Sequence, residues 1–233
     1  MNKAELIVAL DVPNAEAMEA KLQEMPDFIE WYKVGLEIFC AEGPAVLEPL
    51  KKRGKKIFLD LKLHDIPRTV GNAVKTAAEH GVNLMTVHAI GGRAMLEEAA
   101  KAAAECENPP KLVAVTTLTS LSQDDFKDLG INRTVAEQAV ELGRLAISSG
   151  IDGMVTSAHE AKVLREAFPD ALLVTPGIRM PEGDVGDQKR VATPSFAVEQ
   201  GATHLVIGRP IVQAADPTAA ATAMLADMNK QGE

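Results

Sequence analysis

Short apolar runs alternate along this chain with longer stretches in which apolar residues recur every three or four positions. The run at 6–10 is continuously apolar, as is typical of a strand buried on both faces. The longer stretches have the spacing of helices that bury one side. The pattern predicts eight strands, at 6–10, 31–36, 57–62, 84–88, 112–117, 153–156, 172–176 and 204–208. It predicts helices at 15–25, 44–53, 69–79, 94–104, 134–149, 160–167, 194–200 and 217–228.

Strict alternation of strands and helices predicts an α/β fold. Eight units share 233 residues, about 29 residues each, which is close to the size of a (β/α)8 TIM barrel. An open doubly wound sheet has fewer strands and would carry a glycine-rich turn after the first one, where this chain has Asp11-Val-Pro-Asn14. We therefore predict a single barrel domain over 1–233. Two connections, 118–133 and 178–192, are long enough to suggest functional loops.

The composition limits the kinds of partner that the protein is expected to bind. A formal net charge of -9 argues against a nucleic-acid partner, because phosphate backbones require clustered Lys and Arg, although a local basic pocket could still hold a small anion. Cys40 and Cys106 lack the spacing of a metal site and are expected to be free core thiols in a reducing cytosol. No apolar run approaches the roughly 20 residues of a membrane helix. We expect a soluble, cytoplasmic protein.

Charged residues collect at the end of the third predicted strand. Side chains alternate along a strand, so Asp60 and Lys62 share one face, and Asp65 follows just beyond. Lys33 lies on the second strand and Asp11 ends the first. Barrel active sites lie at the carboxyl ends of the strands, so these groups would meet at one rim, where flanking carboxylates would favour the charged ammonium groups. Buried ion pairs can be purely structural, but so many charges at a barrel mouth favour catalysis.

The last two strands predict a phosphate site at the same rim. Gly208 and Arg209 follow strand eight, where backbone N–H groups and a guanidinium could bind phosphate oxygens. Arg179 follows Gly177 after strand seven, and these two loops are the usual phosphate corner of the fold. The polar loop 180–189 contains Gln188 and could be either a lid over the phosphate or an ordinary solvated loop. No His, Cys and carboxylate set has the spacing of a transition-metal site, so neither a metal nor a cofactor is expected.

Five segments in chain order carry these residues: Leu10-Asp11, Tyr32-Lys33-Val-Gly-Leu-Glu37, Asp60-Leu-Lys-Leu-His-Asp65-Ile-Pro-Arg-Thr69, Thr175-Pro-Gly-Ile-Arg179 and Val206-Ile-Gly-Arg209-Pro210. Together they resemble the bacterial type of the orotidine 5'-phosphate decarboxylase family over nearly the whole chain. The Asp60, Lys62 and Asp65 spacing also resembles that of metal-dependent sugar-phosphate decarboxylases and synthases of the same superfamily. Those relatives carry an acidic metal ligand at the end of strand two, where this chain has Lys33.

The resemblance implies a metal-free decarboxylation of orotidine 5'-phosphate to uridine 5'-phosphate in pyrimidine biosynthesis. It implies that Lys62 donates a proton to C6, that Asp60 and Asp65 flank the departing carboxylate, and that Lys33 and Asp11 hold the ribose hydroxyls. Thr119 would contact the base, and the choice between Thr119 and the neighbouring Ser120 stays open. The phosphate would be bound by Gln188, Gly208, Arg209 and Arg179.

Asp65, Ile66 and Thr69 would reach the partner's site in a homodimer with shared active sites. Two alternatives stay open. One is a magnesium-dependent sugar-phosphate decarboxylase or synthase. The other is a catalytically silent barrel that binds a nucleotide, against which the intact Lys62 and Asp65 argue.

Overall fold

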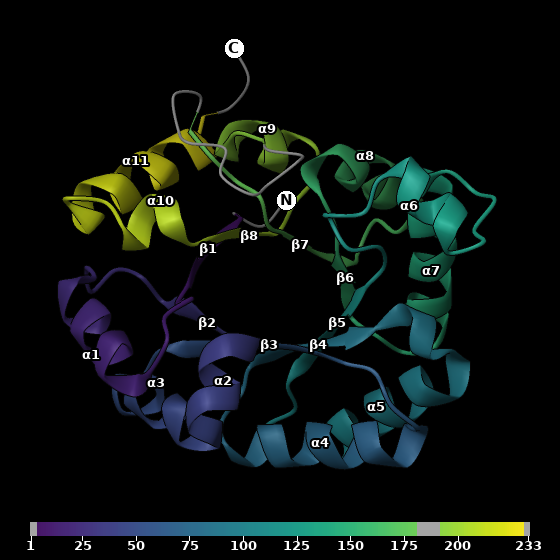
Figure 1. The fold of residues 1–233 in the computed structure, drawn as a ribbon, viewed down its shortest axis with the longest axis horizontal. Helices are drawn as coiled ribbons and strands as arrows, with labels where there is room; N and C mark the ends of the chain where they lie inside the picture. The colour runs from purple at the N-terminus through teal and green to yellow at the C-terminus, as the bar shows by residue number, and fades with distance from the viewer. Residues whose placement is uncertain (1–3, 181–191, 231–233) are drawn as a thin grey trace.

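The strands close into a barrel. The computed structural model describes residues 4–180 and 192–230, and in this part of the chain eight parallel strands pair in sequence order until β8 returns to β1 (Figure 1). The predicted (β/α)8 TIM barrel is confirmed. The strands are β1 (Glu5–Ala9), β2 (Trp31–Gly35), β3 (Lys56–Leu63), β4 (Leu84–His88), β5 (Lys111–Val115), β6 (Gly153–Val155), β7 (Leu172–Thr175) and β8 (His204–Ile207).

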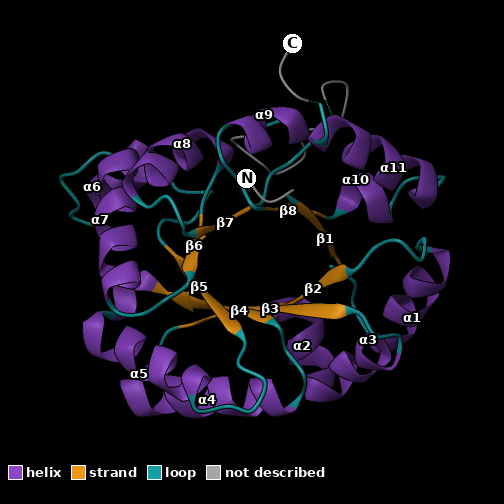
Figure 2. Ribbon diagram, turned by 180° about the vertical axis from the view of Figure 1, so that it is seen from behind, coloured by secondary structure: helices purple, strands orange, loops and turns teal. Residues whose placement is uncertain are grey.

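Helices surround the barrel on all sides (Figure 2). They are α1 (Ala15–Glu24), α2 (Leu36–Glu42), α3 (Glu48–Lys52), α4 (Pro67–Glu79), α5 (Arg93–Ala104), α6 (Gln123–Asp128), α7 (Val135–Ser148), α8 (Ala158–Ala167), α9 (Pro194–Glu199), α10 (Arg209–Val212) and α11 (Pro217–Met228). The eight predicted helices are present within a few residues, except that the region predicted at 44–53 is a 3-10 turn (Gly43–Leu47) followed by α3. The sequence did not predict α2, α6 or α10.

Alternating side chains build two apolar layers. One faces the surrounding helices and includes Val8, Val34 and Leu59, all of which are buried. The other fills the barrel interior and consists of Ile7, Ala9, Trp31, Phe58, Leu84, Val113, Val174 and Val206, with Val155 and Leu172 packed against it. Because the inner layer fills the barrel below the rim, the inward-facing polar side chains further along β2, β3 and β4 are left at the carboxyl ends of the strands.

The opposite end of the barrel holds a buried histidine. The His204 ring packs edge-on against Trp31, with 5.7 Å between ring centroids, and its Nδ1 lies 2.9 Å from the Thr203 hydroxyl. Glu5 accepts the indole N–H of Trp31, and the Lys56 ammonium lies 5.3 Å from the centroid of the same ring. Burial lowers the pKa of His204, and the nearby Glu5 only partly opposes this effect.

The free energy of unfolding is therefore expected to decrease as pH falls below about 6.5, the ordinary histidine pKa. In that window the unfolded chain binds more protons than the folded chain, and one histidine contributes at most about 1.4 kcal/mol per pH unit. The stability that neutral His204 contributes is complete above its pKa in the unfolded chain. That stability is lost as pH falls through the lowered pKa of His204 in the folded chain. Urea unfolding of wild type and His204→Gln at about pH 7.5 and about pH 5.5 measures it. A variant with the same pH dependence as wild type would exclude His204 as a source; burial also lowers the pKa of His88, so part of the dependence should remain.

The structure tests two expectations from the composition, one on the cysteines and one on membrane-spanning helices. Both cysteines are free, but Cys40 is exposed and Cys106 only partly buried, so the expectation of core thiols was wrong. Cys40 lies in α2, a helix that the sequence did not predict. Within residues 4–180 and 192–230, no helix is both long enough and apolar enough to cross a membrane.

Candidate active site

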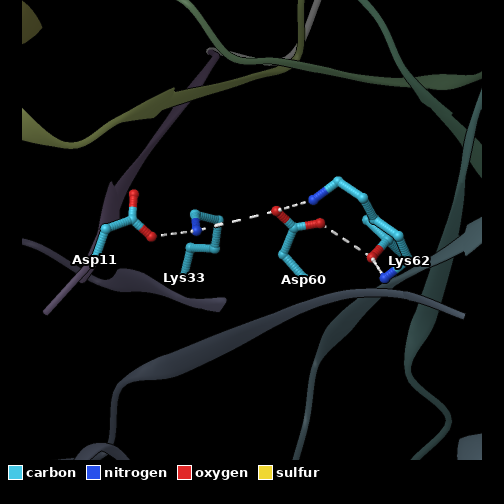
Figure 3. A network of polar contacts seen from close by, with 5 residues as sticks. Asp11, Lys33, Asp60 and Lys62 are labelled. Carbon is cyan, nitrogen blue, oxygen red and sulfur yellow. Dashed lines mark hydrogen bonds and ion pairs between the residues drawn. The ribbon is translucent and has the colours of Figure 1, made fainter. Parts of the chain in front are cut away.

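Four charged side chains form a chain of alternating sign across the mouth of the barrel (Figure 3). The Lys33 ammonium lies 2.7 Å from Asp11 Oδ1 and 3.9 Å from Asp60 Oδ2. The Lys62 ammonium lies 2.9 Å from the same Asp60 oxygen. Asp60 is thus shared by two ammonium groups. The structure brings together these four residues, which the sequence placed at the ends of the first three strands.

Lys33 sits deepest in this chain of charges. Its side chain is 10% exposed, against 31% for Lys62 and 57% for Asp11. Gly35, two residues along β2, makes room for it, because a Cβ there would lie 2.8 Å from Lys33 Nζ and 3.3 Å from Asp11 Oδ1. Lys33 Nζ thus lies between the carboxylates of Asp11 and Asp60.

The backbone departs from regular strand geometry at Lys62. Its φ of 52° makes it the only residue other than glycine with a positive φ in the described part of the chain. The pairing of β3 with β4 shifts register between Leu59 and Leu63, the same place. The Thr86 hydroxyl of β4 accepts the Lys62 backbone N–H at 2.8 Å and donates to Asp60 Oδ1 at 3.0 Å. Sequence reasoning missed Thr86, although a lone hydroxyl within the apolar strand Leu84–His88 was a usable signal.

A cavity of about 170 Å³ opens beside the two lysines. Lys33, Asp60 and Lys62 line part of it, and Thr119 also lines it. The rest is largely apolar: Phe58, Val115, Thr117, Leu118, Val155, Val174, Pro176 and Val206. Apolar walls keep water away and so strengthen the field of the ammonium groups. The cavity therefore places the two ammonium groups beside a largely apolar surface.

Arg179 and Arg209 line a second cavity, of about 340 Å³, that also reaches Gln213 and α11. Arg209 begins α10 directly after Gly208. Arg179 is 8% exposed, its Nη1 donates to the Ile178 carbonyl at 2.8 Å, and its backbone N–H donates to Ala192 at 2.9 Å. Two guanidinium groups from consecutive loops thus border one cavity, as the sequence predicted for a phosphate corner. Gln188 lies outside the described residues.

Three predicted site residues lie apart from the charged chain. Asp65 and Ile66 are exposed, as is Thr69. The Asp65 carboxylate accepts the Ile66 backbone N–H at 2.6 Å, and in residues 4–180 and 192–230 of one chain it forms no ion pair with Lys33 or Lys62. A single chain therefore does not bring Asp65 to the two lysines.

The chain is similar to known proteins over nearly its whole length. A model of the orotidine 5'-phosphate decarboxylase / HUMPS family matches residues 4–224. Orotidine 5'-phosphate decarboxylase of Moorella thermoacetica is 46% identical over 97% of this chain and 92% of its own length. The enzyme of the same name from Trichlorobacter lovleyi is 47% identical over 94% of this chain and 92% of its own length.

Solved structures show the same similarity. The crystal structure of orotidine 5'-phosphate decarboxylase from Lactobacillus acidophilus is 40% identical, with a TM-score of 0.87 over 97% of this chain and all of the other. An uncharacterized conserved protein from Geobacillus kaustophilus is 36% identical, with a TM-score of 0.84 over 96% of this chain. The resemblance seen in the sequence motifs is confirmed: the chain belongs to the orotidine 5'-phosphate decarboxylase / HUMPS family.

Proposed function

We propose that this protein catalyses the decarboxylation of orotidine 5'-phosphate to uridine 5'-phosphate and carbon dioxide, a step of pyrimidine biosynthesis, and that Lys62 is the proton donor. The observation that carries the proposal is the chain Asp11, Lys33, Asp60 and Lys62, which presents an ammonium group to an apolar cavity at the carboxyl rim of the barrel. The curated relatives named above carry the same activity in their names.

The reaction breaks the bond between C6 of the pyrimidine and its carboxylate carbon. The electron pair of that bond stays on C6, carbon dioxide leaves, and C6 takes a proton from the Lys62 ammonium. Solvent then returns a proton to the neutral Lys62 amine. Developing negative charge on C6 needs a positive charge that is already in place, since reorganising groups during the reaction would cost part of the gain. Asp60 holds Lys62 at 2.9 Å and would lie beside the departing carboxylate.

The remaining residues would bind the parts of the substrate that do not react. Lys33 and Asp11 would hold the ribose hydroxyls, and Thr119 would contact the base in the apolar cavity. The phosphate would lie between Arg179 and Arg209 at Gly208, with Gln188 as a further contact. The two cavities would thus receive the two ends of one nucleotide.

The positive charge of Lys62 beside C6 does not by itself account for the rate of decarboxylation. An ammonium about 4 Å from a developing carbanion contributes roughly 4 kcal/mol at an effective dielectric of 20, which is about a thousandfold. The rest must come from positioning, exclusion of water and the binding of remote groups. Contacts to the phosphate should therefore affect rate as well as affinity.

The activity is tested by adding orotidine 5'-phosphate to purified protein in excess EDTA and following the fall in absorbance as orotate becomes uracil. Rapid loss of absorbance supports a decarboxylase that needs no added metal. No loss, from folded protein that still binds uridine 5'-phosphate, would indicate a silent nucleotide-binding barrel. Activity on a sugar phosphate that chelation abolishes would indicate the metal-dependent relatives.

We also propose that the active form is a homodimer with shared active sites. Exposed apolar side chains follow four neighbouring strands at the rim: Leu36 after β2, Ile66 after β3, Ile90 after β4 and Leu118 after β5, with relative exposures of 52%, 66%, 55% and 38%. Such a patch beside a polar site suits burial against a second copy. The partner's Asp65, Ile66 and Thr69 would then complete the site that one chain leaves without Asp65.

Mixing two inactive variants tests this sharing. Lys62→Ala and Asp65→Ala should each be inactive alone, because each leaves every site with one defect. After subunit exchange, a hybrid dimer has one site with both defects and one intact site, so activity should recover to about a quarter of wild type. A matched mixture of Lys62→Ala with Asp60→Ala should recover nothing, since both residues belong to the same chain. No recovery in the first mixture, despite hybrid dimers seen by mass spectrometry, would place Asp65 in its own chain's site.

We also propose that residues 1–233 form one domain and that the protein lies in the cytoplasm. The two free cysteines, one of them exposed, are what a reducing compartment permits. Expression of a fluorescent fusion in a bacterial host would check the location.

A further inference from the structure

We propose that Thr86 is a positioning residue for the decarboxylation, because its hydroxyl fixes both the backbone of Lys62 and the carboxylate that holds the Lys62 ammonium. This inference rests on the proposed function. Thr86 is fully buried and lies on β4. The sequence motifs give it no role in catalysis or binding.

The hydrogen bonds around Thr86 form a closed ring. The Lys62 N–H donates to Thr86 Oγ1 at 2.8 Å, and the Thr86 hydroxyl donates to Asp60 Oδ1 at 3.0 Å. The other Asp60 oxygen accepts from the Lys62 ammonium at 2.9 Å. Thr86 therefore sits between the two ends of the same lysine. Each bond in such a ring polarises the next, and the single hydroxyl hydrogen is used where the ring needs it.

Lys62 needs this support because its backbone is in a conformation that non-glycine residues adopt only when their surroundings hold them there. Its φ is 52°, and the regular ladder between β3 and β4 is interrupted at the same place. The Lys62 N–H thus has the Thr86 hydroxyl as its partner at the point where the ladder shifts register. Without the hydroxyl, that N–H loses its partner and Asp60 loses the bond that fixes its orientation.

Thr175 provides the comparison that separates positioning from packing. It lies on β7, is fully buried like Thr86, and its hydroxyl has no hydrogen-bond partner in the described part of the chain. Replacement of either threonine by valine changes the same atoms in the same kind of place. Only at Thr86 does the change remove contacts to the reacting residues.

The test measures kcat, KM and melting temperature for Thr86→Val, Thr86→Ser and Thr175→Val with orotidine 5'-phosphate. Thr86→Val should lower kcat about 10- to 100-fold, the size of effect that misplacing a reacting group causes, with KM changed less than about threefold because the phosphate contacts are intact. Thr86→Ser should retain kcat within about threefold, and Thr175→Val should match wild type. If Thr86→Val does not fold, Thr86→Ser and Thr86→Ala are compared instead, since they differ only in the hydroxyl.

The inference is overturned if Thr86→Val keeps kcat within about threefold of wild type, if serine fails to restore what valine loses, or if Thr175→Val loses as much. Wild-type turnover tests the proposed function separately. Should the wild type prove inactive, the ¹³Cε resonance of Lys62 in labelled protein serves as the readout. It should then shift in Thr86→Val and not in Thr175→Val, and an unshifted resonance would overturn the inference.

Discussion

The Lys62→Ala variant is expected to lower kcat at least about 10⁴-fold, because one substitution removes both the proton donor and the positive charge beside C6. Uridine 5'-phosphate should still bind within about tenfold of wild type, since its phosphate, ribose and base contacts are made by other residues. Orotidine 5'-phosphate should bind less well than that, because loss of the ammonium leaves Asp60 with Lys33 at 3.9 Å as its nearest cation, facing the substrate's own carboxylate. Single-turnover rates and equilibrium binding of both nucleotides measure these effects.

Lys56→Ala is the matched control. Lys56 begins the same strand, β3, at the opposite end of the barrel, and pairs there with Glu30 at 3.0 Å. This half-exposed pair contributes at most about 1 kcal/mol to stability, so the variant should fold and turn over like wild type. Substantial activity remaining in Lys62→Ala, with Lys56→Ala normal, would remove Lys62 from the role of proton donor.

The strands and the gathering of charged residues at the barrel rim could be predicted because barrel strands have a strict pattern. The strand Leu84–His88 was located to the residue, and alternation placed Asp60 and Lys62 on one face, where the structure has them. Helix starts were harder to find where no polar cap marks them. The helix α2 begins at Leu36 after Gly35, which has no side chain to cap it, so the predicted strand ran one residue too far. The missed helix α6 did carry a signal, the capping box of Ser122 and Asp125.

Other parts of the site depend on tertiary structure. The positive φ of Lys62 could not be predicted, because nothing in its side chain favours that conformation and the hydroxyl that supports it comes from Thr86, on the next strand. The space that Gly35 gives to Lys33 becomes visible only when the folded distances are known. The role proposed for Asp65 needs a second copy of the chain. Sequence patterns identify which residues gather at the rim, while the contacts between them come from packing of neighbouring strands.

Arg209→Ala is expected to lower kcat/KM for orotidine 5'-phosphate about 10³-fold, which corresponds to several kcal/mol of lost transition-state binding. Arg209 follows Gly208 at the start of α10 and shares a cavity with Arg179, far along the nucleotide from the reacting carbon. Binding of the phosphate there would hold the base against Lys62, so its loss should raise KM and also slow the reaction. Steady-state kinetics of the variant measures both parameters.

A substrate without the phosphate separates this role from a structural one. With orotidine, wild type should be slow for want of the phosphate contacts, and Arg209→Ala should be no more than about threefold slower still, because the side chain has nothing to bind. Arg53→Ala, at the opposite end of the barrel from the rim, is the matched control and should resemble wild type with both substrates. An equal loss with orotidine and with its phosphate would mean that Arg209 acts through the fold. An unchanged kcat/KM with the phosphate would exclude Arg209 from the phosphate site and leave Arg179 as the only arginine in the proposal for that corner.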